Sequence, residues 1–303
     1  MAEGTGERLR LGHIVYSNCF PVHARLLDQG APEWITIIEG VPGRLNGLLE
    51  RGDVDVAPCS SIEFARNADR YRVLPDLVIG ARGAVRSIVF ATTRPPEQLD
   101  DALVAVPTAS ATSVVLLKVL LRLRWGVQPR YRWFDQASED PFAGGADAAL
   151  FIGDVALRPD LYPQVPLRFD LGAEWGAHTG LPFAFAVWQA AGGSDEALLR
   201  LHGELLESRA YGLANRADLA ARWADRFGFD AAFLESYWAG LSFELDDAML
   251  QGLETFYRLA AEIGEIPQAP RLHFTHPRAP AGDATPSSAR PPAVVERPQR
   301  GGG

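Results

Sequence analysis

Short apolar runs that end in a small polar turn and then continue as a helical pattern recur through the first two thirds of the sequence. One such unit spans residues 102–121, ALVAVPTASATSVVLLKVLL, where an apolar run breaks at Pro107 and a helical apolar pattern extends from Val114 to Leu121. In a strand–turn–helix unit, the first turn of the helix has backbone N–H groups without partners inside the helix. These groups can bind a ligand and favour an anion. Repeated units of this kind favour α/β domains with parallel strands covered by helices on both faces.

The turn at residues 107–113 differs from the phosphate loops of nucleotide-binding proteins. It matches neither GxxxxGK[ST] nor GxGxxG, so a nucleotide phosphate is not the expected ligand. Four of its residues carry hydroxyls, Thr108, Ser110, Thr112 and Ser113, and the last three are the candidate ligands. A small anion bound by hydroxyls and backbone N–H groups is the expectation for this turn.

Composition narrows the class of protein. With 303 residues, 47% of them apolar, the chain can form one large or two medium domains. A net charge of −9 argues against nucleic acid or an anionic membrane as a partner. Cys19 and Cys59 suggest neither a disulfide framework nor a metal site, and we expect them to be small buried side chains. The sequence has no apolar signal segment and no membrane-length apolar run, so a reduced, cytoplasmic protein is expected, with its oligomeric state undetermined.

Strand-like runs and polar turns alternate along the chain. The runs lie at residues 9–15, 34–38, 54–57, 77–79, 86–91, 102–106, 130–134, 146–152 and 183–188. Polar turns lie at strand ends or helix starts, at residues 16–18, 59–61, 108–113, 153–154 and 178–180. Because parallel sheets bind ligands at the carboxyl ends of their strands, these turns are the candidate binding surfaces.

The sequence also indicates a domain boundary and a non-globular C-terminal tail. RPPEQLDD, from Arg94, is a polar, proline-marked connection, and residues 102–172 resemble a second α/β unit. Beyond Ser194 the pattern is helical, with amphipathic spacing in DEALLRLHGELLESRAYGL and DAMLQGLETFYRLAAEIG. Residues 277–303 are rich in Pro, Ala and Gly and are predicted to be a disordered tail.

Seven sequence blocks, in order, resemble the chorismate dehydratases, a family of the futalosine route of menaquinone biosynthesis. The blocks are YSNCFP, LNGLLERGDVDVAPCSSIEF, VRSIVF, ASATSVVLL, ALFIGDVAL, DLGAEW and TGLPFAFAVW, between about Leu9 and Trp188. The 1,4-dihydroxy-6-naphthoate synthase of the same route shares the general layout and is the nearest alternative. The Tyr-x-Asn-Cys turn, Ile-Gly-Asp and Thr-Gly-Leu-Pro-Phe favour the dehydratase.

The resemblance implies a fold similar to the type II periplasmic binding proteins. It has two α/β lobes, each a mostly parallel sheet flanked by helices, joined by two crossovers. We expect lobe 1 to be discontinuous, residues 1–93 plus 183–276 with the C-terminal helices, and lobe 2 to be inserted as residues 94–182. The return crossover is expected at residues 179–183.

The resemblance also implies a reaction: dehydration of chorismate to 3-[(1-carboxyvinyl)oxy]benzoate, a lyase step without cofactor or metal. Such a site needs fixed neutral donors for two carboxylates and a leaving hydroxyl rather than a strong nucleophile. Asn18 and Ser87 carry over as the catalytic residues. The expected substrate-binding residues lie in the hydroxyl-rich turns and at the return crossover: Ser60, Ser61, Ser110, Thr112, Ser113, Thr179 and Gly180.

Simpler roles remain open for several of these positions. The hydroxyls near residues 60 and 112 can cap the helices that follow them. Asp154 is expected to cap a helix only, because a carboxylate beside an anionic substrate would repel it. The C-terminal helices need only pack. A binding protein for a small carboxylate, without chemistry, is the alternative function from a different class.

Overall fold

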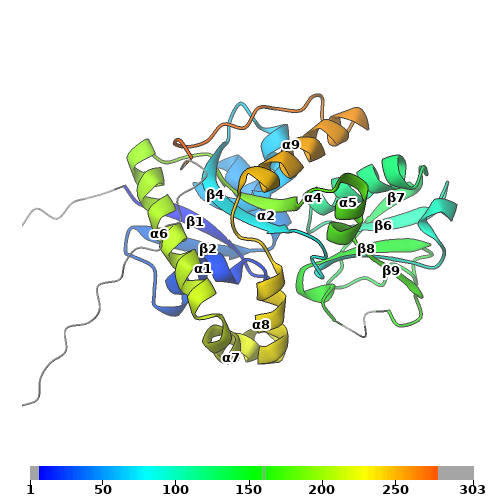
Figure 1. Ribbon diagram of the computed structural model, residues 1–303, viewed down its shortest axis with the longest axis horizontal. Helices are drawn as coiled ribbons and strands as arrows, with labels where there is room; N and C mark the ends of the chain where they lie inside the picture. Colours follow the sequence, from blue (N-terminus) through cyan, green and yellow to red (C-terminus); the bar gives the residue numbers. More distant parts are fainter. Residues whose placement is uncertain (1–6, 159, 161, 279–303) are drawn as a thin grey trace, which may run out of the picture.

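The structure is a computed structural model that describes residues 7–158, 160 and 162–278. Most of the predicted tail, from residue 279 onward, lies outside the described residues. Within them, two five-stranded sheets form two lobes, and Figure 1 shows the second sheet on the right, away from the long helix α6.

The first sheet has the strand order β2-β1-β3-β10-β4. Its strands are β1 (Leu9–Ile14), β2 (Ile35–Gly40), β3 (Val56–Ser60), β4 (Arg72–Ala81) and β10 (Phe183–Ala190). The second sheet has the order β7-β6-β8-β5-β9. Its strands are β5 (Ile88–Thr92), β6 (Leu103–Pro107), β7 (Arg130–Phe134), β8 (Ala148–Ile152) and β9 (Leu167–Asp170).

Each sheet has one strand that runs against the other four. In the first sheet β10 is antiparallel to both β3 and β4, while β1 is parallel to β2 and β3. In the second sheet β5 is antiparallel to β8 and β9, while β6 is parallel to β7 and β8. The reversed strand is in each case the one that enters from the other lobe. The predicted two-lobed α/β fold with mostly parallel sheets is therefore confirmed.

The first crossover lies earlier than the sequence suggested. The expected boundary at residues 93 and 94 left the run before Thr92 in lobe 1, but β5 pairs with β8 and β9 of the second sheet. The chain therefore changes sheet between Ala81 and Ile88. Both neighbours of β5 are remote in sequence, which is why its apolar pattern alone could not assign it to a sheet. The return crossover falls between Thr179 and Phe183, the stretch named from the sequence.

Nine α-helices and three short helical segments occur within the described ranges. The helices are α1 (Phe20–Asp28), α2 (Pro42–Arg51), α3 (Ser61–Arg66), α4 (Thr112–Val119), α5 (Leu171–Thr179), α6 (Asp195–Ala214), α7 (Arg216–Phe227), α8 (Ala231–Gly240) and α9 (Asp247–Glu262). The short segments are η1 (Pro96–Gln98), η2 (Leu120–Arg124) and η3 (Gly153–Val155). Proline opens α2 and Gly52, at φ +74°, closes it, as the sequence indicated.

A separate apolar cluster joins α1 to α7 and α8. It contains Phe20, Leu219, Leu234, Tyr237 and Trp238, all almost completely buried. This cluster places α8 against the end of β1, which matters for the site described below. Cys19 and Cys59 are both buried free thiols, as expected. None of the helices in the described part of the chain combines the length and apolarity needed to cross a membrane.

Candidate active site

One carboxylate joins the two lobes at the carboxyl ends of their strands. Asp154 lies in η3, directly after β8, and accepts hydrogen bonds from Ser17, which follows β1. The Ser17 N–H donates to both carboxylate oxygens at 3.1 Å, and its hydroxyl donates to Oδ1 at 2.5 Å. Burial raises the pKa of Asp154, and the bonds from Ser17 oppose that rise. Asp154 was expected only to cap a helix; instead it spans the junction.

Gly153 connects this junction to the first crossover. Its N–H donates to the Ser87 carbonyl at 2.8 Å, and its φ of +65° is a conformation that glycine adopts without strain. A Cβ at Gly153 would stand 2.7 Å from the ring of Tyr16, so the close approach of the two lobes also requires glycine. Asn18 and Ser87 are therefore linked through Ser17, Asp154 and Gly153.

The two residues expected to be catalytic each carry a buried polar atom without a partner. Among the described residues, Asn18 Oδ1 and Ser87 Oγ are buried side-chain oxygens that make no hydrogen bond. Such atoms are uncommon because an unpaired buried polar group costs about 1–3 kcal/mol. They are candidates for contacts to a bound molecule.

A third buried oxygen in the same state comes from the C-terminal helices. Tyr237, in α8, is 1% exposed, and its hydroxyl likewise has no hydrogen-bond partner within the described chain. It lies beside Ser87 without a well-formed bond between the two hydroxyls. The next residue, Trp238, donates from Nε1 to the Ser17 carbonyl at 2.8 Å. The helical pattern of the sequence gave no sign of this unpartnered hydroxyl, because a buried tyrosine on a helix looks like packing.

Ser61 and Thr112 form a second bridge between the lobes. Thr112 Oγ1 accepts from the Ile62 N–H at 3.1 Å and lies 3.3 Å from Ser61 Oγ, which donates to the Ala184 carbonyl at 2.8 Å. Ser60 Oγ accepts from the Ala111 N–H at 3.4 Å. These predicted binding residues do lie together at the junction, but their hydroxyls are engaged by the protein itself.

Ser110 and Ser113 stay within the start of α4. Ser113 donates its N–H to Ser110 Oγ at 3.3 Å, and the two hydroxyls are 3.1 Å apart. Both side chains are nearly buried. This local pair orders the turn, and it keeps two hydroxyls next to the positive end of the α4 dipole.

Thr179 and Gly180 have the contacts of a helix end. Thr179 Oγ1 donates to the Trp175 carbonyl at 2.9 Å and accepts from the Leu181 N–H at 3.2 Å. Gly180, at φ +73°, is the C-cap of α5. The structure places them at the return crossover and accounts for both without a ligand.

A buried histidine pair lies under the Asn18 turn. His13 Nδ1 and His23 Nδ1 are 3.0 Å apart, and Trp188 Nε1 donates to His23 Nε2 at 3.1 Å. Since His23 Nε2 must accept, neutral His23 carries its proton on Nδ1 and donates it to His13.

Cys19 approaches this pair closely enough for the three residues to be a possible metal group. However, the Trp188 bond leaves His23 Nδ1 protonated and without a lone pair for a metal. Burial also raises the pKa of Cys19 to about 12, so it remains a thiol. The group fits a neutral hydrogen-bonded network better than a metal site.

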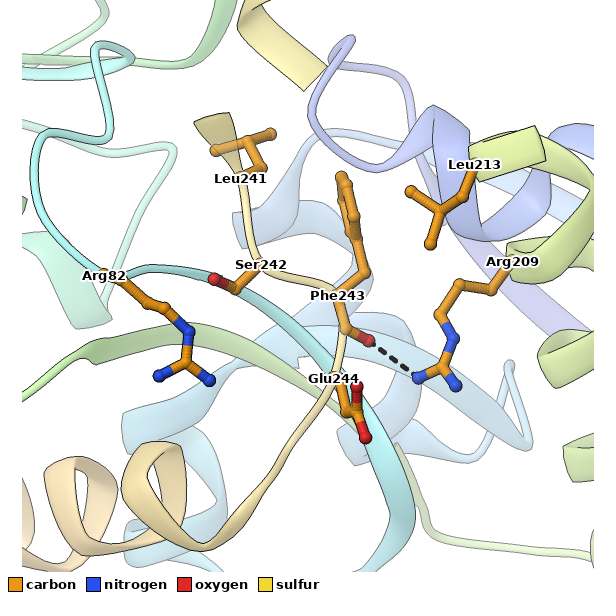
Figure 2. A pocket seen from close by; sticks show the side chains of 7 residues that line it. All are labelled: Arg82, Arg209, Leu213, Leu241, Ser242, Phe243 and Glu244. Atoms are coloured by element: carbon orange, nitrogen blue, oxygen red, sulfur yellow. Dashed lines mark hydrogen bonds between the residues drawn. The ribbon is translucent and has the colours of Figure 1, made fainter. Parts of the chain in front are cut away.

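A cavity of about 250 Å³ lies elsewhere, along the segment between α8 and α9 (Figure 2). Its lining combines that segment with the first crossover and α6: Arg82, Arg209, Leu213, Leu241, Ser242, Phe243 and Glu244. Figure 2 shows the two guanidinium groups on opposite sides of the 241–244 segment. Arg82 pairs with Asp246, and Arg209 donates to the carbonyls of Asp76 and Phe243. With both cations already engaged, this cavity is poorly suited to a dianionic ligand.

The two mixed sheets and the polar junction between them define a two-lobed α/β protein of the periplasmic-binding-protein type. Similar solved structures include a protein from Archaeoglobus fulgidus, with a TM-score of 0.70 and 19% identity over 86% of this chain and 98% of that one. The periplasmic aliphatic sulphonate binding protein of Escherichia coli has a TM-score of 0.59 and 17% identity over 88% of this chain and 90% of its own. At these identities the likeness concerns the fold.

The sequence comparisons identify the family. The model of the menaquinone biosynthesis family matches residues 9–262, and the chain belongs to this family. It is 32% identical to the chorismate dehydratase of Thermus thermophilus, over 87% of this chain and 97% of that protein. It is 33% identical to the chorismate dehydratase of Campylobacter jejuni, over 58% of this chain and 64% of that protein.

Proposed function

We propose that this chain is a chorismate dehydratase, converting chorismate to 3-[(1-carboxyvinyl)oxy]benzoate and water at the junction of the two lobes. The observation that carries the proposal is the pair of buried unpartnered oxygens, Asn18 Oδ1 and Ser87 Oγ, at the linked ends of β1 and the first crossover. Relatives named chorismate dehydratase align along most of the chain and support the same reaction.

The dehydration needs only fixed hydrogen-bond donors and dipoles from the protein. The hydrogen on the ether-bearing carbon is acidic through the ring diene and the ring carboxylate. Its removal gives an enolate-like anion, which expels the neighbouring hydroxyl and becomes aromatic. The protein stabilises charge that develops on the ring carboxylate and holds the reacting groups in place.

The residues at the junction can share this work. Ser110 and Ser113, with the N–H groups at the start of α4, suit a carboxylate, and hydrogen bonds to a charged group contribute about 1.5–3 kcal/mol each. Asn18 has an amide that can both donate and accept beside the reacting carbons. An amide is too weak to be the base, so we assign the proton to the enolpyruvyl carboxylate of the substrate itself.

Ser61 and Thr112 have a different part in this proposal. Because their hydroxyls bind the opposite lobe, they hold the junction closed and keep Ser110 and Asn18 at a fixed separation. Ser60 acts in the same way through the Ala111 N–H. Thr179 and Gly180 fix the return crossover and are assigned no direct contact with the substrate.

The reaction belongs to the futalosine route, and we place the protein in the cytoplasm, with no cofactor. Purified protein incubated with chorismate should form the aromatic product, detected by ultraviolet absorbance and mass spectrometry. Asn18→Ala should lower kcat/KM by at least about 100-fold, and Ser87→Ala should lower it by about 10- to 100-fold. Tight binding of unchanged chorismate would point to a binding protein, and turnover of cyclic de-hypoxanthine futalosine instead would point to the naphthoate synthase.

The base assignment has its own test. A chorismate analogue with an amide in place of the enolpyruvyl carboxylate should bind but fail to dehydrate. Turnover of that analogue at the rate of chorismate would show that a protein group removes the proton.

A further inference from the structure

We propose that the hydroxyl of Tyr237 touches the substrate together with Ser87, and that both donate hydrogen bonds to the ring hydroxyl that leaves as water. This inference rests on the proposed dehydration and adds a catalytic residue from a helix that the sequence assigned to packing alone.

The geometry begins with two buried hydroxyls side by side. Tyr237 and Ser87 are 1% and 0% exposed, and within the described residues neither hydroxyl oxygen has a hydrogen-bond partner. They come from different parts of the chain, α8 and the first crossover, so no local motif explains their meeting. Folding desolvates both groups, and the contact between them does not reach normal hydrogen-bond geometry, so each hydroxyl remains able to bond to a ligand.

Another buried tyrosine shows how this protein normally satisfies such a group. Tyr257, in α9, is also fully buried, and its hydroxyl donates to the Ser61 carbonyl at 2.7 Å. Buried tyrosines usually find a partner of this kind. The difference between Tyr237 and Tyr257 is therefore informative, because both side chains are buried and, within the described chain, only the Tyr237 hydroxyl lacks a well-formed hydrogen bond.

The Tyr237 side chain is held rigidly from several directions. The adjacent Trp238 is anchored by its bond to the Ser17 carbonyl and stacks on Phe20 at 5.2 Å between ring centroids. The Tyr237 ring stacks on Phe233 at 6.4 Å. The same helix thus fixes Tyr237 and the turn that carries Asn18, so the phenol and the amide have a constant relation to each other.

The surroundings of Tyr237 keep its phenol protonated. Burial raises the pKa of Tyr237, as do the carboxylates of Asp154 and Asp170, while Ser87 and Arg86 act in the opposite direction. The phenol therefore stays protonated and can donate but cannot act as a base. The Arg86 guanidinium, 5.8 Å from the Tyr237 ring centroid, offsets the two carboxylates, so we assign the ring hydroxyl as the partner because it is the group on which negative charge develops as it leaves.

The step balances without any further reagent. The C–H bond at the ether-bearing carbon breaks and its electron pair becomes a ring double bond, while the C–O bond of the neighbouring hydroxyl breaks with its pair going to oxygen. The proton taken by the enolpyruvyl carboxylate passes to the departing oxygen and completes water. Tyr237 and Ser87 keep their own protons and stabilise the negative charge that develops on that oxygen.

The test is Tyr237→Phe, which removes the hydroxyl and keeps the ring. In the full-length protein kcat for chorismate should fall about 100-fold with KM changed less than about 3-fold, because the contact strengthens only as the hydroxyl leaves. The unfolding midpoint without substrate should be unchanged or higher, since an unpaired buried hydroxyl has been removed. Tyr257→Phe is the matched stability control and should lower that midpoint, because it leaves the Ser61 carbonyl without its donor.

The other outcomes each overturn a distinct statement. Wild-type kcat in Tyr237→Phe, with an active wild type, would remove Tyr237 from the site and leave the dehydration intact. A raised KM with unchanged kcat would assign the phenol to substrate binding and contradict the leaving-group role. A midpoint lowered as far as in Tyr257→Phe would make the residue structural. A wild-type protein that leaves chorismate unchanged would overturn the proposed function itself, and this inference with it.

Discussion

Ser17 donates both its backbone N–H and its hydroxyl to the carboxylate of Asp154, so two residues 137 positions apart tie the ends of β1 and β8 together. The contact places a charged group directly beside the predicted catalytic turn. The contact holds Asn18, the next residue, at a fixed position relative to the second lobe. We expect its main role to be the positioning of that turn.

Asp154→Asn should loosen the junction. The amide offers one acceptor oxygen in place of two and turns its N–H₂ group toward donors, so we expect a loss of about 1–3 kcal/mol in the free energy of unfolding. Substrate affinity should fall with it, seen as a higher KM. Denaturant unfolding and steady-state kinetics measure the two effects.

Asp135→Asn provides the control for this change. Asp135 also accepts from a backbone N–H and a serine hydroxyl, those of Ala137 and Ser138, but entirely within one exposed loop. Its substitution should leave KM at the wild-type value. An equal rise of KM in both variants would contradict a specific role for the Ser17–Asp154 contact.

Gly43 allows the first lobe to touch the α4 turn, and Gly43→Ala should force the two apart. The Gly43 N–H donates to the Ala109 carbonyl at 3.1 Å, and a Cβ there would lie 2.9 Å from the Thr108 carbonyl oxygen. Backbone on both sides must shift by a few tenths of an ångström. We expect kcat/KM for chorismate to fall about 10-fold, since small displacements of positioning groups are costly.

The same helix supplies a matched control in Gly47. A Cβ at Gly47 would meet only the flexible end of Arg51, at 3.2 Å. Gly47→Ala should therefore leave kcat/KM unchanged and raise the free energy of unfolding by up to about 1 kcal/mol through helix propensity. Loss of activity in both variants would mean that α2 as a whole, rather than the Gly43 contact, supports the site.

Individual elements show how much of the fold could be predicted from the sequence. The apolar runs located the strands, and Pro42 and Gly52 located a helix, because those signals are local. The sheet to which β5 belongs was misassigned because its partners in β8 and β9, Ile152 and Asp170 among them, are remote in sequence. Local patterning can reveal a strand without revealing its neighbours.

The residues of the candidate site show which of its features a sequence can indicate. Family resemblance, rather than any spacing rule, indicated Asn18 and Ser87. The sequence could not show that the hydroxyls of Ser61 and Thr112 bind the protein, since that depends on how the lobes meet. The sequence could not indicate Tyr237, which we propose as a further site residue, because its distinguishing property is a hydroxyl unpartnered within the described residues, which only the three-dimensional arrangement displays.

Thr112→Val should separate the bridging role of this hydroxyl from substrate binding. The change keeps the side-chain shape and leaves the buried Ile62 N–H without its acceptor, so the free energy of unfolding should fall by about 1–3 kcal/mol even without substrate. Thr93→Val removes an exposed hydroxyl bonded to the Asp147 carbonyl and should cost far less. Unfolding curves of the two variants make the comparison, and equal losses would rule out a special role for the bridge.

The His13–His23 pair should make the protein sensitive to acid. Burial lowers the pKa of His13 to about 4 and lowers that of His23 as well. As the pH falls through about 6.5, these histidines bind protons in the unfolded chain but remain neutral in the folded protein. The free energy of unfolding is therefore highest above pH 6.5 and declines toward pH 4. His13 alone should account for a loss on the order of 3 kcal/mol across this window.

His13→Gln tests this assignment because its amide oxygen can still accept from His23 Nδ1 and it has no titrating ring. Stability at pH 7.5 should stay close to the wild-type value, while the loss between pH 6.5 and 4 should become clearly smaller. Urea unfolding at half-unit pH intervals provides the measurement. A variant that loses stability as steeply as the wild type would mean that groups other than His13 bind the protons in this pH range.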